Sequence, residues 1–315
     1  MFRLKIVPQT TRIPFIGMRN ITFVLSGLFS LGAILLYLTL GLNYGIDFRG
    51  GTMIEISTEG PADLGRIRGI VTGLGLGDVQ AQTFGADNTV LIRLEQQEGG
   101  ERAQQEGVVK VKAALDRDYG SPLEYRRIEL VGPKVSGDLV NAGILAVSLA
   151  VAAMLIYVWF RFEWQFGVGS VIALAHDVVM TIGVFALLQL EFNLATVAAI
   201  LTIIGYSMND TVVVYDRVRE NLRKYKKMPL EELLDLAINE TLSRTTMTSM
   251  ATLISLGALF IFGGEVIRGF SFAMIWGIVI GTYSSIFIAA PFLLLVGVKR
   301  DWSGLGNETK AAKNP

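Results

Sequence analysis

The sequence contains no cysteine and a single histidine, His176. Without cysteine the chain cannot form a disulfide, use a thiolate nucleophile or hold zinc through thiolates. One histidine also excludes a metal site built from several histidines. The 28 Lys and Arg residues balance 28 Asp and Glu residues, so no basic surplus indicates nucleic-acid binding. These absences exclude most classes of enzyme, and no cofactor is predicted.

Hydrophobic residues make up 51% of the chain, and they gather into runs long enough to cross a bilayer, which takes about 20 residues. The first run is longer than the apolar core of a signal peptide and no A-x-A cleavage site follows it, so we expect an uncleaved anchor. The predicted spans are 21–42, 139–160, 167–189, 194–215, 246–263 and 270–297.

Basic residues in the short connections predict the orientation. They occur in the N-terminal segment 1–20, after spans two and four, and at the start of the tail 298–315. These regions lie on one side if the spans alternate, so we expect both termini in the cytoplasm. The insert 43–138 is then extracytoplasmic, and periplasmic in a cell with two membranes.

The insert has the pattern of a small α+β domain. "TMIEIS" alternates like a strand, Pro61 opens a helical pattern, and "GADN" is typical of a turn between two strands. A second helical pattern and the strand "LEYRRIEL" follow. The order β-α-β-β-α-β predicts a ferredoxin-like fold, which by itself does not indicate a function.

The link 216–245 between spans four and five has a basic half and an amphipathic half. "PLEELLDLAINET" places leucines opposite acidic residues at helical spacing. We expect this segment to lie on the membrane face or on a partner, with a plain surface connector as the alternative.

Ionisable residues within the spans are few, and they fall on consecutive spans. Span three carries His176 and Asp177, span four carries Asp210, and Arg244 lies within a turn of span five. Because charges in a helical bundle avoid lipid, we expect them to face one another, with Asp210 and Arg244 as an ion pair. Hydroxyl residues along span five, Ser249 among them, extend this polar region.

Each of these residues also has a structural explanation. Arg244 could extend to the headgroups, Asp177 could bond a neighbouring helix, and His176 could be a core residue. A serine protease with Ser207 as nucleophile and His176 as base was considered, but "GYSMND" lacks a small residue before the serine. Asp210 is the hardest to explain without a function.

Five motifs resemble those of the SecF family of the bacterial Sec export machinery, which belongs to the resistance–nodulation–division superfamily. They occur in order from the end of span one to the start of span five: "GLNYGIDFRGGTMIEI", "VGPKVSGDL", "ALAHDVVMTIG", "GYSMNDTVVVYDRVREN" and "NETLSRTTMTS". The resemblance implies a multi-pass protein of the bacterial inner membrane. It also implies a partner, SecD, association with the SecYEG channel, YajC and YidC, and action on an unfolded secreted polypeptide on the periplasmic side.

The resemblance further implies that the proton gradient drives late translocation, after the SecA ATPase has acted. The residues expected to couple protons are Asp210, Arg244, Asn209, Thr211 and Asp177. A stand-alone exporter of hydrophobic molecules and a passive scaffold of the translocon are the alternatives.

"GIDFRGG" matches the family signature at the periplasmic edge, through Asp47, Phe48, Gly50 and Gly51. The glycines permit a sharp turn from span one into a strand, and a hinge is the alternative.

Overall fold

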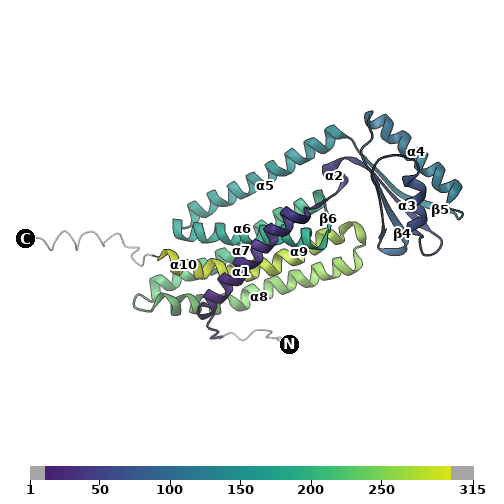
Figure 1. The fold of residues 1–315 in the computed structure, drawn as a ribbon. Helices are drawn as coiled ribbons and strands as arrows, with labels where there is room; N and C mark the ends of the chain where they lie inside the picture. The colour runs from purple at the N-terminus through teal and green to yellow at the C-terminus, as the bar shows by residue number, and fades with distance from the viewer. Residues whose placement is uncertain (1–10, 299–315) are drawn as a thin grey trace, which may run out of the picture.

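The chain forms a bundle of long helices with a small α+β domain at one end (Figure 1). The computed structural model describes residues 11–298. The first ten residues and most of the predicted tail 298–315 therefore lie outside the described residues. Two connections join the parts: the segment that follows the first long helix, and the long helix α5.

Six helices in the described part are long and apolar enough to cross a membrane, with the α+β domain inserted after the first. The predicted number of spans and the position of the insert are confirmed. The helices are α1 (Arg19–Leu40), α5 (Pro133–Arg161), α6 (Trp164–Leu188), α7 (Leu194–Lys224), α8 (Leu230–Phe262), and a last span made of α9 (Glu265–Ser284), the π-helical segment η2 (Ser285–Ala289) and α10 (Ala290–Val296).

Local signals account for several helix ends. Asn193 and Thr196 form a capping box at the start of α7. Pro133 occupies the first turn of α5, where a proline removes no helical hydrogen bond. Helix α7 extends beyond its apolar run to Lys224, because Arg, Glu, Leu and Lys, which have good helix propensity, continue it.

The α+β domain has the predicted ferredoxin-like topology. Its four antiparallel strands are ordered β3-β4-β2-β5, and α3 and α4 pack on one face around a core that includes Ile54, Ile56 and Leu115. Helix α3 begins after Asp63 rather than at Pro61, because the Asp63 carboxylate caps it by accepting from the Arg66 backbone N–H. The elements are β2 (Gly51–Thr58), α3 (Leu64–Thr72), β3 (Val79–Phe84), β4 (Ala86–Leu94), α4 (Gly100–Asp118) and β5 (Leu123–Val131).

The amphipathic segment at the start of α8 differs from the prediction. Leu233, Leu234 and Ala237 are fully buried and pack in one cluster with Val218 and Leu222 of α7. The expectation that this segment lies on the membrane face or on a partner is wrong, because α7 continues to Lys224 and covers the apolar stripe within the chain.

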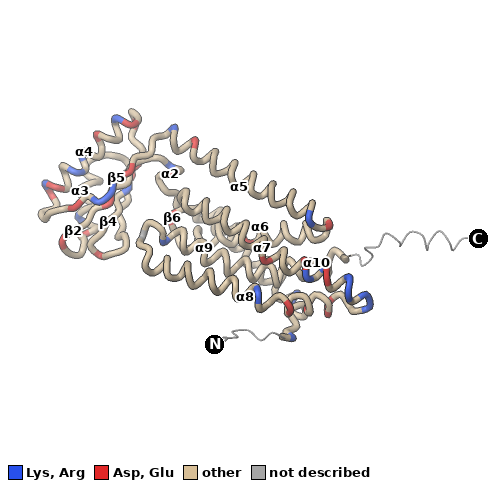
Figure 2. Tube along the Cα trace, turned by 180° about the vertical axis from the view of Figure 1, so that it is seen from behind, with Lys and Arg blue, Asp and Glu red and all other residues tan. Residues whose placement is uncertain are grey.

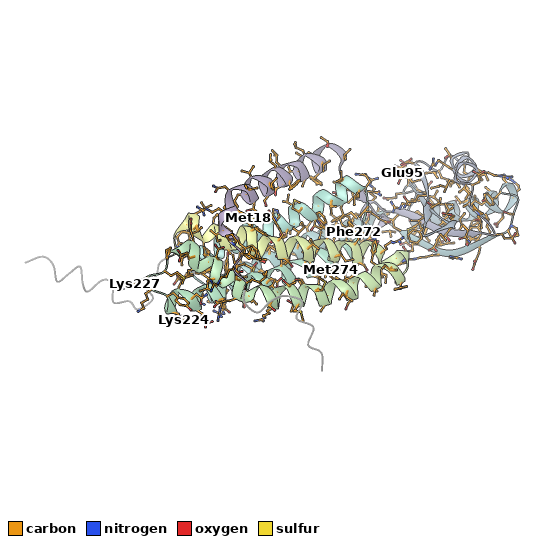
Figure 3. All side chains as sticks on the ribbon, turned by 90° about the horizontal axis from the view of Figure 1, so that it is seen from below. Met18, Glu95, Lys224, Lys227, Phe272 and Met274 are labelled. Carbon is orange, nitrogen blue, oxygen red and sulfur yellow. The ribbon has the colours of Figure 1, made fainter. Side chains whose placement is uncertain are left out.

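Basic side chains gather at the end of the bundle away from the α+β domain (Figure 2). Figure 3 shows Lys224 and Lys227 at that end, far from Glu95 in the α+β domain. Two ion pairs join helices there: Arg161 to Asp216 at 2.6 Å and Arg217 to Glu240 at 2.7 Å. The two ends of the bundle therefore differ in charge.

Candidate functional site

Asp210 lies in the middle of the bundle on α7, with only 2% of its surface exposed. The hydroxyls of Ser249 on α8 and Thr282 on α9 face its carboxylate, and they bond to each other at 2.9 Å. The Oδ2 atom of Asp210 has no hydrogen-bond partner among residues 11–298. A buried carboxylate oxygen without a partner is costly, so this atom is a candidate site for a proton.

Arg244 does not form the predicted ion pair with Asp210 in this structure. Its side chain is exposed on α8, and it acts on Asp210 only through space. The two neighbours of Asp210 in the sequence also point elsewhere. Asn209 is exposed, while the buried Thr211 hydroxyl donates to the Ser207 carbonyl at 3.2 Å. Of the residues predicted to couple protons, Arg244 and Asn209 are thus not in contact with Asp210.

Asp177 on α6 is fully buried and well bonded. Its Oδ2 accepts from the hydroxyls of Ser207 on α7 at 2.5 Å and Ser284 on α9 at 2.9 Å. Its Oδ1 lies 3.2 Å from Nδ1 of His176. Three helices therefore converge on this carboxylate, and Ser207 stands one helical turn before Asp210 on α7. Asp177 therefore bonds neighbouring helices, as its structural interpretation expected, and its part in proton coupling stays a prediction.

The geometry does not support a serine protease. The Ser207 hydroxyl donates to Asp177, and within the described residues no hydrogen bond joins it to His176. His176 instead lies against Tyr283, with ring centroids 6.1 Å apart. Ser207 and His176 therefore do not form the nucleophile–base pair that this mechanism needs.

Three hydroxyl residues of the last span were missed from the sequence: Thr282, Tyr283 and Ser284. The run "GTYSS" carries no charge, although its density of hydroxyls within an apolar span was a usable signal. The π-helical segment Ser285–Ala289 follows immediately, and π-helical turns are frequent at functional sites. The Tyr215 hydroxyl of α7 donates to the carbonyl of Ala289 in this segment at 2.9 Å.

The "GIDFRGG" segment lies where the bundle meets the α+β domain. Asp47 on the short helix α2 (Ile46–Arg49) accepts at 2.9 Å from the backbone N–H of Leu194, the first residue of α7. Beside it, β1 (Asn43–Tyr44) pairs in parallel with β6 (Glu191–Phe192), and the Phe48 and Phe192 rings pack 5.9 Å apart. The segment therefore joins the α+β domain to the start of the helix that carries Asp210.

Gly50 and Gly51 both have a positive φ, of 73° and 116°. A Cβ on Gly51 would lie 2.4 Å from the Leu94 carbonyl oxygen, so only glycine fits this approach of two strands. The turn predicted from the sequence is present, and the hinge stays a prediction.

An ion pair links the same junction. Arg93 on β4 pairs with Glu191 on β6, and burial raises the pKa of the Glu191 carboxyl above its usual range while Arg93 opposes that shift. Within residues 11–298 no group of three or more His, Asp or Glu side chains could hold a metal ion.

Two family models match the chain. Residues 110–299 match "Protein export membrane protein SecD/SecF, C-terminal", and residues 38–62 match the "SecD/SecF GG Motif". The chain is 49% identical to the protein translocase subunit SecF of Cereibacter sphaeroides over 305 residues, which cover 95% of this chain and 94% of the relative. It is 44% identical to SecDF of Brucella abortus, covering 98% of this chain but only 40% of that protein.

A solved structure is also similar. The crystal structure of SecDF from Thermus thermophilus, a translocon-associated membrane protein, superposes with a TM-score of 0.84 at 33% identity. The match covers 94% of this chain and 40% of the SecDF chain. A SecDF structure in a super-membrane-facing form gives a TM-score of 0.68 at 32% identity, covering 99% of this chain and 41% of the other.

Proposed function

This chain belongs to the SecD/SecF family of protein-export membrane proteins, and on that premise we propose that it couples proton entry to the movement of a secreted polypeptide. It is a multi-pass membrane protein and a translocase subunit of the SecF type, so its role is transport rather than enzymatic catalysis. The observation that carries the proposal is the Asp210 carboxylate, which is 2% exposed and has an oxygen without a hydrogen-bond partner in the described part of the chain.

Asp210 is the group that takes up and releases the proton. A carboxylate at this depth is disfavoured while charged, and it persists where it has a function or a partner. The hydroxyls of Ser249 and Thr282 supply donors when it is ionised. Arg244 is the counter-ion of a second conformation, in which its exposed side chain turns towards Asp210.

The basic end of the bundle faces the cytoplasm, and the α+β domain lies on the periplasmic side of a bacterial inner membrane. This follows from the positive-inside rule applied to the connections α5–α6 and α7–α8. The ion pairs of Arg161 and Arg217 belong to that cytoplasmic end.

The partner is a SecD-type protein that carries a related half. One family model describes the C-terminal regions of both SecD and SecF. This chain covers only 40% of each of the two SecDF proteins, so more than half of each lies outside the match. Transporters of two related halves place their ion sites at the seam between the halves. The partner therefore covers an exposed face of the bundle near α8, and the pair associates with SecYEG, YajC and YidC.

Motion reaches the periplasmic side through α7. Protonation of Asp210 changes how α7 packs on α8 and α9, and the Asp47–Leu194 bond passes that shift to the α+β domain. The domain then acts on the unfolded polypeptide as it leaves the channel.

The test is export of a secreted protein into membrane vesicles with Asp210→Asn, which keeps the side-chain size and removes the charge. Asp216→Asn is the matched control, a carboxylate six positions further along α7 that pairs with Arg161 at the exposed end. We expect Asp210→Asn to abolish the gradient-dependent part of translocation while the complex with the partner stays intact, and Asp216→Asn to retain it. Full gradient dependence in Asp210→Asn would refute the proposal.

A further inference from the structure

A lateral cavity of about 710 Å³ opens between α1 and α5, with α6 and α7 behind it. Figure 1 shows α5 running apart from α1 and α6 towards the α+β domain. Apolar side chains make up most of its wall, among them Ile34, Val140, Ile144, Val147, Val178 and Ile182. We call this cavity the α1–α5 slot.

The depth of the slot matches one leaflet of a bilayer. Its wall on α5 runs from Val140 to Ser148, which is roughly 12 Å at a rise of ~1.5 Å per residue. The hydrocarbon core of one leaflet is about 15 Å thick, half of a ~30 Å core. The slot therefore spans the apolar part of the leaflet on the side of the α+β domain.

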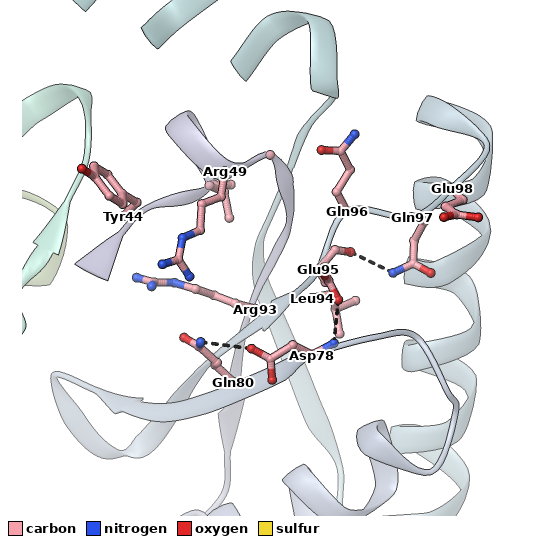
Figure 4. Close-up of a pocket in the computed structure, with 12 residues that line it drawn as sticks. Tyr44, Arg49, Asp78, Gln80, Arg93, Leu94, Glu95, Gln96, Gln97 and Glu98 are labelled. Carbon is pink, nitrogen blue, oxygen red and sulfur yellow. Dashed lines mark hydrogen bonds between the residues drawn. The ribbon is translucent and has the colours of Figure 1, made fainter. Parts of the chain in front are cut away.

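The charged residue of the slot lies at the mouth nearest the α+β domain, beside an aromatic residue. Tyr44 and Arg49 line this end, and the Arg49 guanidinium lies 6.0 Å from the Tyr44 ring. Figure 4, a close-up of the adjoining pocket, shows the Arg49 side chain running towards that of Arg93, with Tyr44 to one side. An apolar wall with aromatic and basic residues at its rim has the polarity of an interfacial site.

Arg49 is the basic residue of this mouth that contacts no carboxylate within residues 11–298. Its side chain is exposed, and the carboxylates of the junction contact other groups. Glu191 pairs with Arg93, and Asp47 accepts from the Leu194 backbone N–H. An anion is therefore the complementary ligand for Arg49.

We propose that the α1–α5 slot holds an anionic phospholipid of the surrounding bilayer. The acyl chains lie along α1, α5 and α6, and the phosphate lies at the Arg49 guanidinium, within reach of the Tyr44 hydroxyl. Basic pockets between membrane helices bind acidic headgroups in this way. The slot opens sideways towards the bilayer, so a lipid enters without crossing the bundle.

The test is native mass spectrometry of the protein taken from nanodiscs of equimolar phosphatidylglycerol and phosphatidylethanolamine. We expect phosphatidylglycerol to be retained in preference to phosphatidylethanolamine. Arg49→Gln should reduce that preference about fivefold, the value of one basic residue near an anionic surface, without reducing the total lipid retained. Arg102→Gln, on the exposed face of α4, is the charge-matched control and should change neither quantity.

The apolar part of the slot is tested by Gly143→Leu, which places a side chain between α1 and α5. Gly137→Leu on the same helix is the control, since Gly137 lies outside the slot and no atom lies within 4 Å of a Cβ at either position. Leucine favours a helix over glycine, so both variants should fold. We expect Gly143→Leu alone to lower retention of both lipids.

Three results would overturn the proposal. The first is an Arg49→Gln protein with an unchanged lipid preference. The second is a Gly143→Leu protein that retains as much lipid as Gly137→Leu. The third concerns the occupant. A photoreactive residue at Val147 should give an adduct with the mass of a phospholipid, and an adduct to a polypeptide would show that a protein segment fills the slot.

Discussion

The hydrogen bonds to Asp177 allow a quantitative prediction about the bundle. Ser207 and Ser284 each donate a hydroxyl to the same carboxylate oxygen, from two different helices. A hydrogen bond between membrane helices contributes on average about 0.6 kcal/mol, whereas one to a charged group contributes about 1.5–3 kcal/mol. The larger range applies to a hydroxyl that a carboxylate accepts, as Asp177 does here.

We expect Ser207→Ala to lower the free energy of unfolding by about 1.5–3 kcal/mol. The Ser207 bond is short and its hydroxyl is buried, so alanine leaves the carboxylate with one donor fewer and no water to replace it. Ser284→Ala should cost less, because the Ser284 hydroxyl also lies 3.1 Å from the Gly281 carbonyl and is shared between two acceptors.

The assay is reversible unfolding in mixed detergent and dodecyl sulfate micelles, followed by tryptophan fluorescence. Ser255→Ala is the control, since its exposed hydroxyl bonds only the Ala251 carbonyl of its own helix, at 3.1 Å, and should cost less than ~0.5 kcal/mol. In an Asp177→Asn background, Ser207→Ala should lower the free energy of unfolding by at least ~1 kcal/mol less than it does when Asp177 is present. Equal costs for Ser207→Ala and Ser255→Ala would refute the interpretation that these hydroxyls hold Asp177 between the helices.

Two predictions concern the junction with the α+β domain. Asp47→Ala leaves the Leu194 N–H at the start of α7 without its acceptor, so we expect a loss of about 1 kcal/mol and weaker gradient-dependent export, with Asp47→Asn restoring most of both. Burial raises the pKa of Glu191 above its ordinary value of 4.5, with Arg93, Asp47 and Glu129 as the charged groups around it. The folded state therefore binds the Glu191 proton more tightly than the unfolded state does, and this binding stabilises the fold. The stabilisation is complete below pH 4.5 and is lost as the pH rises through the pKa that Glu191 has in the folded state. Glu191→Gln should remove this part of the pH dependence measured by thermal unfolding, and an unchanged profile would contradict it.

The features that sequence reasoning predicted are those that depend on local pattern. The length of an apolar run reports a membrane span, because the bilayer sets the length. Strand alternation and helical spacing fix the order of elements in the insert, since Ile54 and Ile56 must share one face. Asp210 stood out for the same reason, as a charge in an apolar run.

The features that it missed depend on which helix faces meet. The stripe of Leu233 and Leu234 predicted a partner for α8, but only the fold reveals that the partner is the extension of α7. The sequence predicted Arg244 at a depth similar to that of Asp210, yet the Arg244 side chain leaves α8 on an exposed side. The run of hydroxyl residues in the last span could be seen in the sequence, but the sequence did not indicate that Ser284 among them bonds Asp177.

Helix α7 connects the junction with the α+β domain, the buried carboxylate of Asp210 and the charged end of the bundle. This connection bears on how a proton could act at a distance. It starts at the Asp47 bond, carries Ser207 and Asp210 in its middle, and ends near the Arg217–Glu240 pair. Its 31 residues form one rigid element of roughly 46 Å. A shift of α7 at Asp210 must therefore also move its first residue, because an α-helix transmits displacement along its axis. Coupling between the carboxylate and the α+β domain then needs one two-state helix and one hydrogen bond, rather than a chain of side chains.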